Sequence, residues 1–392
     1  MAEWRSYTVG EVARVFDGPH ATPKKTSSGP WFLSISSLDR GRLNLAESAH
    51  LSENDFVRWT RRVTPEQGDV LFSYETRLGD AALMPQGVKA CLGRRMGILR
   101  PNRDRVLPRF LLLAYLSPNF QATIRSGAIY GATVDRIPLT DLPKWPIEIP
   151  DLHRQAAIVE VLGALDDKIT VSERIADTAE ELCRAIFSEQ SWEARTTIES
   201  IASLRKEQVV PGALSEVCVA HYSLPAFDSG AMPAMVDPRS IKSSKFVVRQ
   251  PSVLLSKLNP DIPRVWNVSP YRECVALAST EFLVLEPRNG VTAAELWAVL
   301  SQPGLLGGLA SKVTGTSKSH QRVRPAEVMT SYVVDPRDLG DVRGQARALA
   351  SRVTQARDES RALATLRDAL LPQLMSGKLR VRDAEKIVED AV

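Results

Sequence analysis

Apolar and small residues recur in alternating steps of four and three along residues 151–187, and this pattern predicts one long amphipathic helix. The stripe consists of Ile158, Leu162, Leu165, Ile169, Ser172, Ala176, Ala179, Cys183 and Ile186. A stripe this narrow is typical of a coiled-coil seam and requires a partner helix. Asp151 follows Pro150 and is suited to cap the helix N-terminus. At about 1.5 Å per residue the helix would be roughly 55 Å long.

The same spacing returns in residues 339–376, which therefore supply the partner helix within the chain. The second stripe consists of Val342, Ala346, Leu349, Val353, Ala356, Ser360, Leu363, Arg367, Leu370 and Leu374. Pro372 should kink the last turn or end the helix early, and Gly377 is a natural C-terminal stop. We expect the two helices to pack as an antiparallel coiled coil.

Each long helix follows a block of short apolar runs and turns, and the second block repeats the order of the first. In the first block, residues 31–38 and 68–74 predict strands and residues 107–127 predict a helix. The sequence VLFS at 70–73 is answered by VLLS at 253–256, and GILRP at 97–101 by LVLEP at 283–287. These and further correspondences fall at offsets of 183 to 187 residues, which indicates an internal repeat.

The repeat predicts an α+β fold with two recognition domains joined by two long helices in a pseudo-twofold arrangement. The expected segments are a first domain at 1–150, a first coiled-coil helix at 151–190, a second domain at 191–337, and a second coiled-coil helix with a C-terminal tail at 338–392. Two modules on a rigid spacer suit double-stranded DNA, which presents its bases again every 34 to 36 Å or so.

The net charge of +4 is unevenly distributed. The first block holds 20 Lys and Arg against 15 Asp and Glu, the second 16 against 13, and residues 151–190 hold 4 against 9. Two mildly basic blocks beside an acidic helix fit blocks that contact a polyanion, although many soluble surfaces have this balance.

Several other classes of protein are disfavoured by the sequence. No apolar run is long enough to span a membrane and the N-terminus lacks the layout of a signal peptide, so we expect a cytoplasmic protein. The four cysteines and five histidines are scattered, which predicts neither a metal site nor a disulfide framework. Phosphate-loop, dinucleotide-binding and zinc-protease motifs are absent. The acidic pair at 166–167 lies on the predicted helix, which makes a nuclease site there improbable.

Polar loops rich in cations and amides are the candidates for DNA contact. In the first block these candidates are Lys24, Lys25, Tyr74, Arg77, Arg94, Arg95, Tyr130, Thr133 and Arg136. In the second block they are Lys242, Lys245, Lys257, Asn259, Arg264, Thr316, Lys318, His320, Gln321, Arg322 and Arg324. Amides match adenine and arginines match guanine or phosphate. The alternative for each is a solvated loop side chain or, for Asn259, a turn former.

Motifs across nearly the whole chain resemble the DNA specificity subunits of type I restriction-modification enzymes. The segments IPDLHRQAAIVEVLGALDDKI and LRDALLPQLMSGKLRV are similar to parts of that family's two long helices. HYSLPAFD, IKSSKF, LLSKLNPDIPRVW and GTSKSHQRVR are similar to one class of its recognition domains.

The resemblance implies a non-catalytic subunit in which each block reads half of a bipartite, asymmetric DNA site. It implies further that the helices dock two methyltransferase subunits, to which motor-nuclease subunits are added. No cofactor is expected on this chain, while S-adenosylmethionine, ATP and Mg²⁺ are expected on the partners. The alternative is a coiled-coil adaptor of a defence complex that reads no sequence.

Overall fold

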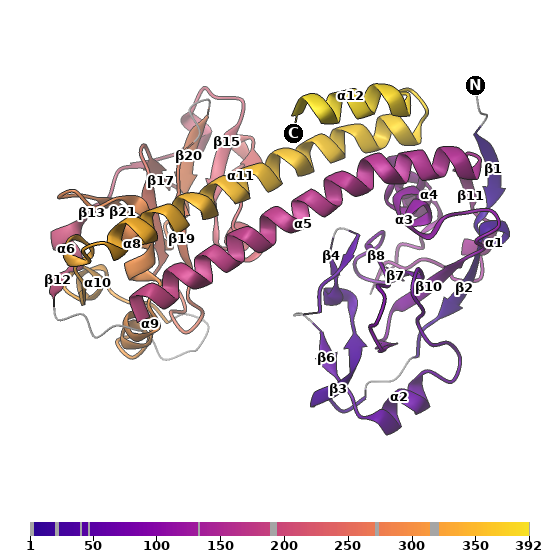
Figure 1. The fold of residues 1–392 in the computed structure, drawn as a ribbon, viewed down its shortest axis with the longest axis horizontal. Helices are drawn as coiled ribbons and strands as arrows, with labels where there is room; N and C mark the ends of the chain where they lie inside the picture. The colour runs from indigo at the N-terminus through magenta and orange to yellow at the C-terminus, as the bar shows by residue number, and fades with distance from the viewer. Residues whose placement is uncertain are drawn as a thin grey trace. The chain divides into compact units, whose positions relative to one another are not determined.

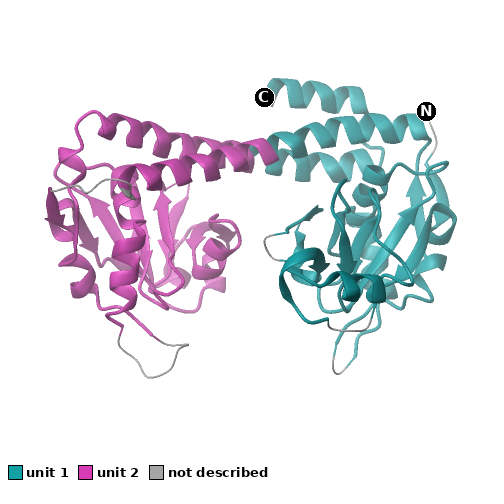
Figure 2. Ribbon diagram, turned by 60° about the horizontal axis from the view of Figure 1, so that its bottom comes forward, with its two compact units in different colours: residues 1–169, 362–392 teal, residues 170–361 magenta. Residues whose placement is uncertain are grey.

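The computed structural model describes residues 4–19, 23–39, 41–45, 48–131, 134–188, 194–270, 274–313 and 321–391 (Figure 1). The chain forms two compact units (Figure 2). Unit 1 comprises residues 1–169 and 362–392, and unit 2 comprises residues 170–361. Both long helices continue from one unit into the other, so each unit contains a part of each helix.

The core of unit 1 is an antiparallel sheet with strand order β2–β10–β7–β8. Its strands are β2 (Ala13–Asp17), β7 (Val70–Ser73), β8 (Ala81–Leu83) and β10 (Met96–Pro101). All side chains of β7 are buried, as an interior strand requires. Helices α3 (Pro108–Leu116) and α4 (Pro118–Gly127) follow the sheet, and Phe110 of α3 shares a buried cluster with Phe72.

Smaller elements surround this sheet in unit 1. Strand β1 (Arg5–Thr8) pairs antiparallel with β11 (Pro146–Ile149), and the short helix α1 (Val9–Val12) follows β1. A second sheet has the order β6–β3–β9, with β3 and β9 parallel. The remaining elements are β3 (Thr26–Leu33), β4 (Leu38–Asp39), β5 (Arg42–Leu43), β6 (Ala49–His50), β9 (Ala90–Leu92), α2 (Glu53–Trp59) and the 3₁₀ turns Ile35–Ser37 and Leu142–Lys144.

Two elements of unit 1 differ from the sequence prediction. The strand expected at 31–38 ends at Leu33, because the Ser37 hydroxyl accepts a hydrogen bond from the Ser34 N–H at 2.9 Å and closes a 3₁₀ turn. The helix expected at 107–127 is divided at Ser117, which has an extended backbone with φ −63° and ψ 147°. Pro118 disfavours a helical conformation of the preceding residue, and the Ser117 hydroxyl then caps α4.

Unit 2 is built on an antiparallel sheet with order β13–β21–β18–β19. Its strands are β13 (Ala202–Arg205), β18 (Ser252–Ser256), β19 (Val265–Val268) and β21 (Phe282–Pro287). Helices α8 (Ala293–Leu300) and α9 (Pro303–Ala310) follow the sheet in the chain. Strand β12 (Arg195–Thr197) pairs antiparallel with β22 (Tyr332–Val334), and the short helix α6 (Ile198–Ile201) follows β12.

A second sheet in unit 2 has the order β14–β17–β20–β15–β16, in which β15 and β20 are parallel. Its strands are β14 (Gln208–Val209), β15 (Val219–Tyr222), β16 (Ala234–Val236), β17 (Lys245–Val248) and β20 (Val275–Ala278). The remaining elements are α7 (Leu224–Asp228), α10 (Pro325–Met329) and the 3₁₀ turns Pro211–Ala213, Pro238–Ser240 and Pro336–Asp338.

The internal repeat predicted from the sequence is present in the main sheets. Val70 pairs with Leu99 in unit 1, and Val253 pairs with Leu285 in unit 2, at the same places in the two strand orders. The paired strands and short helix at the start of each unit also correspond. The second sheets differ between the units, so the repeat covers the main sheet and its helices.

The two predicted long helices are present as α5 (Leu152–Ser188) and α11 (Val342–Met375), and they pack together within each unit. In unit 1 the buried seam consists of Ile158, Leu162, Leu165 and Ile169 of α5 with Leu363 and Leu370 of α11. In unit 2 the seam includes Cys183 of α5, Ala346 and Val353 of α11, and the partly buried Ile186 and Leu349. The Asp151 carboxylate caps α5 by accepting the Arg154 N–H at 3.0 Å.

Cations within the helix pair have carboxylate partners on the opposite helix. Arg367 of α11 lies 3.0 Å from the Asp166 carboxylate of α5 in unit 1. Arg357 of α11 pairs with Glu180 of α5 in unit 2. Arg367, the charged position of the second stripe, therefore forms an ion pair between the helices, as does Arg357 beside the stripe. Within the described ranges, no helix combines the length and apolar character needed to cross a membrane.

The C-terminal residues form a helix that the sequence prediction missed. Helix α11 continues through Pro372 to Met375 and stops before Gly377, which has φ +69°. Helix α12 (Val381–Ala391) follows and lies beside α11 (Figure 1). Val381, Ala384 and Val388 of α12 pack against the core of unit 1. The expected tail is therefore an additional layer of unit 1.

Candidate nucleic-acid interface

In unit 2, the loop after β18 is fixed where three chain segments meet. The N–H of Lys257 donates to the carbonyl of Glu281 at 3.0 Å, and the N–H of Val323 donates to the carbonyl of Lys257 at 3.0 Å. The N–H of Asn259 donates to the carbonyl of Gln321 at 2.8 Å. We call this arrangement junction 2 and define it as residues 256–259, 281 and 321–323.

Unit 1 has the same arrangement after β7. The N–H of Tyr74 donates to the carbonyl of Arg95 at 3.0 Å, and the N–H of Ile137 donates to the carbonyl of Tyr74 at 2.8 Å. The N–H of Thr76 donates to the carbonyl of Asp135 at 3.4 Å. We call this arrangement junction 1 and define it as residues 73–76, 95 and 135–137. Each unit thus brings three of its loop segments together at one place.

Two candidate arginines around junction 2 are held by carboxylates. The guanidinium of Arg264 donates to both Asp228 oxygens at 2.6 and 2.8 Å, and its side chain is 11% exposed. Arg322 donates to both Glu281 oxygens at 3.0 and 2.9 Å, which lowers the pKa of that carboxyl. These bidentate pairs hold the loops in place, and they occupy the donors that a base contact would use.

Around junction 1 the cations are also paired, with one exception. Arg95 lies 3.0 Å from the Glu75 carboxylate, and Arg77 pairs with Asp80. Arg136 is exposed, and its backbone forms an isolated antiparallel β-bridge with that of Glu75. Arg136 is therefore an exposed cation of junction 1.

The remaining described candidates fall into exposed and half-buried groups. The exposed group contains Lys24, Lys25, Arg94, Tyr130, Lys242 and Arg324. The half-buried group contains Lys257 and Gln321, both within junction 2. The Tyr130 hydroxyl donates to the carbonyl of Arg125 at 2.9 Å, which orients its exposed ring. These side chains have the exposure that contact with a polyanion requires.

Two candidates are buried, contrary to what a loop contact needs. Tyr74 is 6% exposed, and burial together with a hydrogen bond to Asp17 raises the pKa of its phenol. Lys245 is also 6% exposed, and its ammonium donates to the Ser243 carbonyl at 2.9 Å and hydroxyl at 2.6 Å. Tyr74 directly follows β7 and Lys245 begins β17, and both side chains pack inside their units. Thr133, Thr316, Lys318 and His320 lie outside the described residues.

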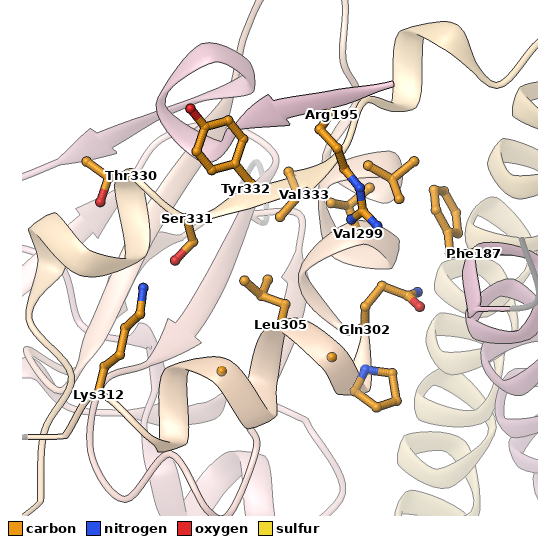
Figure 3. A pocket seen from close by; sticks show the side chains of 14 residues that line it. Phe187, Arg195, Val299, Gln302, Leu305, Lys312, Thr330, Ser331, Tyr332 and Val333 are labelled. Atoms are coloured by element: carbon orange, nitrogen blue, oxygen red, sulfur yellow. The ribbon is translucent and has the colours of Figure 1, made fainter. Parts of the chain in front are cut away.

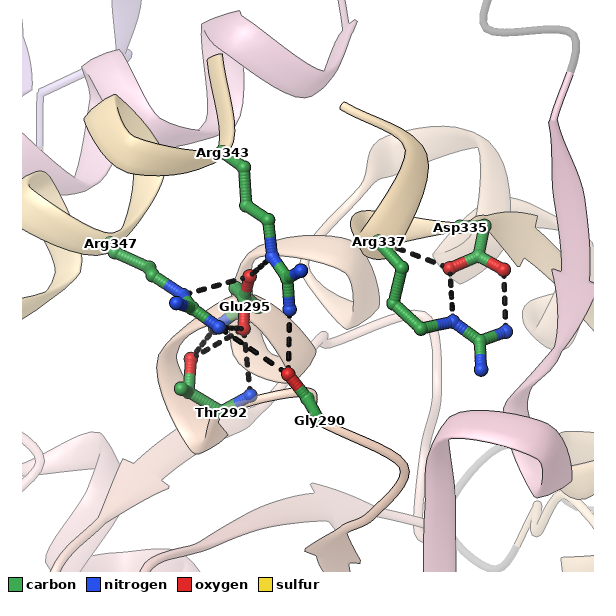
Figure 4. A network of polar contacts seen from close by, with 7 residues as sticks. All are labelled: Gly290, Thr292, Glu295, Asp335, Arg337, Arg343 and Arg347. Carbon is green, nitrogen blue, oxygen red and sulfur yellow. Dashed lines mark hydrogen bonds and ion pairs between the residues drawn. The ribbon is translucent and has the colours of Figure 1, made fainter. Parts of the chain in front are cut away.

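A buried carboxylate that sequence reasoning overlooked joins α8 to α11 in unit 2 (Figure 4). The Glu295 side chain is fully buried and pairs with Arg343 and with Arg347, whose Nε lies 3.0 Å away. Burial by itself raises the pKa of Glu295, but hydrogen bonds from Arg343, Arg347 and Thr292 lower it overall. The spacing T-x-x-E at 292–295 is the sequence signal, since it forms a capping box at the start of α8.

At the corresponding contact in unit 1 the buried group is a neutral amide, beside an exposed ion pair between Arg109 of α3 and Asp167 of α5 at 3.1 Å. The buried Gln155 of α5 accepts a hydrogen bond from the Leu107 N–H at 2.9 Å. Its amide nitrogen donates to the carbonyls of Arg105 and Pro150, both at 2.9 Å. One side chain therefore fixes the start of α5 against the segment before α3. The two units attach their long helices by different chemistry.

Unit 2 also contains an open cavity of about 600 Å³ between α9 and the β12–β22 pair (Figure 3). Its lining combines the cations Arg195 and Lys312 with Leu305 and Tyr332. A smaller cavity of about 240 Å³ lies at the matching place in unit 1, where the lining includes Glu148. The cavity is thus a feature of the repeat, with cations in unit 2 and a carboxylate in unit 1.

Residues 1–181 match the model of the type I restriction modification DNA specificity domain. The specificity subunit of the type I restriction enzyme HindI from Haemophilus influenzae is 25% identical over 205 residues, which cover 49% of this chain and 41% of that protein. A putative specificity subunit of the enzyme MjaX from Methanocaldococcus jannaschii is 28% identical over 122 residues, which cover 31% and 27%. The aligned regions span less than half of either relative.

The fold is similar to that of the S subunit of a type I restriction-modification system from M. genitalium, with a TM-score of 0.56 and 15% sequence identity. The match covers 95% of this chain and 96% of that one. It confirms the predicted α+β class with long helices that pack together. Residues 1–181 are thus similar to a type I restriction modification DNA specificity domain, and the fold of the chain is similar to that of a type I S subunit.

Proposed function

We propose that this chain is the non-catalytic subunit that selects the DNA sequence in a type I restriction-modification complex. Each unit reads one half of a bipartite, asymmetric site. The observation that carries the proposal is the repetition of junction 1 in junction 2, with the same backbone hydrogen bonds and with cations or amides around both. A repeated module is what the reading of two separate half-sites requires.

The side chains divide into two roles in this proposal. Exposed cations such as Lys24, Lys25, Arg94 and Lys242 neutralise phosphates and fix the position of each unit on the duplex. Amides at the junctions, Asn259 and Gln321, have the donor and acceptor pair that matches adenine in the major groove. The phosphate contacts supply affinity, and the amides supply discrimination between bases.

The helix pair provides the surface for the partner subunits. Val171 and Leu182 of α5 are 55% and 51% exposed although they are apolar. Apolar side chains exposed along a helix favour packing against further helices. We assign this surface to a methyltransferase subunit, with two such subunits per chain. The methyltransferase subunits hold S-adenosylmethionine. The motor-nuclease subunits that join the complex hold ATP and Mg²⁺.

The test is to express this chain with its cognate methyltransferase subunit in a host free of adenine methylation and to map modified adenines across the genome. We expect one bipartite motif with a fixed gap, which disappears when this chain is omitted. A stable complex that methylates no defined motif would contradict the proposal and favour the adaptor function, in which the complex binds DNA with no preference over random duplex.

A further inference from the structure

Thr76 and Asn259 occupy the same position in the two repeats and share an unusual backbone conformation. Each is the third residue after its VLFS or VLLS strand segment, at an offset of 183 residues. Thr76 has φ +69° and Asn259 has φ +47°. This left-handed region is uncommon for any residue with a side chain, and it is least favourable for a β-branched residue such as threonine.

Both junctions hold this conformation with matching contacts. The hydroxyl of Ser73 donates to the carbonyl of Glu75 at 2.6 Å, and the hydroxyl of Ser256 donates to the carbonyl of Leu258 at 2.9 Å. In addition, the N–H of Ser73 donates to the carbonyl of Asp80, and the N–H of Ser256 to the carbonyl of Arg264, both at 3.0 Å. Strain that the surroundings enforce at two equivalent positions indicates a functional demand.

An ion pair closes each junction, although its members come from different segments. In junction 1, Glu75 of the loop pairs with Arg95. In junction 2, Glu281, which is equivalent to Arg95, pairs with Arg322. The two junctions therefore keep the same backbone geometry with different charges. A shared scaffold with varied side chains is what two modules need if they read different bases.

A role in turn formation alone does not explain these residues. Glycine adopts a positive φ without strain and would be the simplest solution at both positions. Asparagine tolerates this conformation, but threonine does not favour it. The Thr76 side chain is exposed, and its hydroxyl accepts a hydrogen bond from the Arg95 guanidinium at 3.3 Å. The Asn259 Oδ1 is shielded from solvent and has no hydrogen-bond partner among the residues that the structure describes. An amide oxygen left unsatisfied in this way calls for an explanation beyond the turn, such as a ligand.

We propose that Thr76 and Asn259 are equivalent specificity-determining residues, each presented by its junction to the half-site that its unit reads. The inference rests on the proposed function and names the side chains through which it is carried out. The hydroxyl of Thr76 and the amide of Asn259 contact base edges. The ion pairs Glu75–Arg95 and Glu281–Arg322 act as positioning pairs behind them.

Glycine substitution separates recognition from turn formation, because glycine retains the backbone conformation and removes the side chain. Thr76→Gly and Asn259→Gly are each purified with the methyltransferase subunit and assayed on duplexes that carry the mapped motif. We expect melting temperatures that are unchanged or raised. Methylation rates should be about 5- to 150-fold lower, because each variant loses one specific base contact. The motif should relax only in the half that the altered unit reads.

Ala231→Gly is the matched control, because Ala231 has φ +52° in a turn outside both junctions. It should leave rate and motif unchanged. Asn259→Asp retains a side chain that tolerates the turn but replaces an amide donor with a charge that DNA repels, so it should lose activity even if the glycine variant is destabilised. Wild-type rates and motifs in Thr76→Gly, Asn259→Gly and Asn259→Asp would overturn the inference. Absence of a motif in the wild-type complex would instead overturn the proposed function.

Discussion

Glu295 is the residue on which the attachment of α11 in unit 2 depends most directly. Its buried carboxylate accepts hydrogen bonds from two arginines of α11 and from the backbone of Thr292 (Figure 4). Removing one member of a buried charged network leaves the others with unsatisfied groups. The arginines are 25% and 43% exposed, so solvent compensates part of that loss.

We expect Glu295→Gln to lower the free energy of unfolding by about 2–3 kcal/mol, because it removes charge-assisted hydrogen bonds at a buried site. The measurement is urea unfolding of the full chain at neutral pH. Glu359→Gln is the control, since Glu359 is exposed on α11 and should change stability by less than about 0.5 kcal/mol. Equal effects of the two substitutions would contradict the role of Glu295.

The same substitution makes a prediction about pH. The pKa of Glu295 in the folded chain lies below the ordinary glutamate value of 4.5, so its stabilisation is present above that value and is lost as the pH falls through the folded pKa. The difference in melting temperature between wild type and Glu295→Gln should therefore shrink in acid. A difference that stays constant down to about pH 3 would show that the carboxylate charge is not what stabilises the joint.

At the level of residues, the sequence does not show which of the candidate side chains are paired or buried in the folded chain. Arg264 and Arg322 were predicted as DNA contacts, but each is paired with a carboxylate 36 or 41 positions away in the chain. Residues that far apart in the chain do not follow the spacing of one helix or strand. The sequence pattern therefore does not predict these ion pairs, and the structure is needed to find them. Tyr74 was likewise predicted from its position beside a strand, and its burial depends on how the sheet packs.

Helix α12, which the sequence did not predict, stabilises unit 1 by packing against its core. It packs against unit 1 through Val381, Ala384 and Val388, and Ala384 is fully buried. We expect Ala384→Asp to lower the free energy of unfolding by about 2–4 kcal/mol, because it buries a carboxylate without a partner. The measurement is again urea unfolding, with Glu385→Asp on the exposed face as control. If the two variants unfold alike, α12 does not stabilise unit 1.

The long helices were predictable because their stripes extend over many turns, whereas shorter elements were not. The apolar residues of α12 are few among charges, so its pattern resembled a solvated tail. The break between α3 and α4 carried a local signal in Pro118, which was outweighed by the apolar run around it. Element type follows from long periodicity, while element ends depend on single caps and prolines.

For the molecule as a whole, we propose that the length of α5 and α11 sets the gap between the two half-sites. Four residues are inserted after Ile169 in α5 and after Arg361 in α11, where the helices pass between the units. The insertion adds about 6 Å and slightly more than one turn. We expect the unread spacer to lengthen by one or two base pairs, at about 3.4 Å each.

The spacer is measured by mapping methylated adenines in cells that express the altered complex. As control, four residues are inserted after Gly230, in a turn of unit 2 that leaves both helices intact. The control should retain the original gap. A gap that does not change when both helices are lengthened would show that they do not determine it.

The central claim is that the two units read separate halves of one site, and exchanging one recognition domain tests it most directly. Residues 1–150 are replaced by the corresponding domain of a relative with a different motif, which keeps β1 paired with β11 and leaves the Asp151 cap of α5 in place. Methylated adenines are then mapped. We predict that one half of the motif changes and the other half and the gap are retained. A change in both halves, or in neither, would contradict the account.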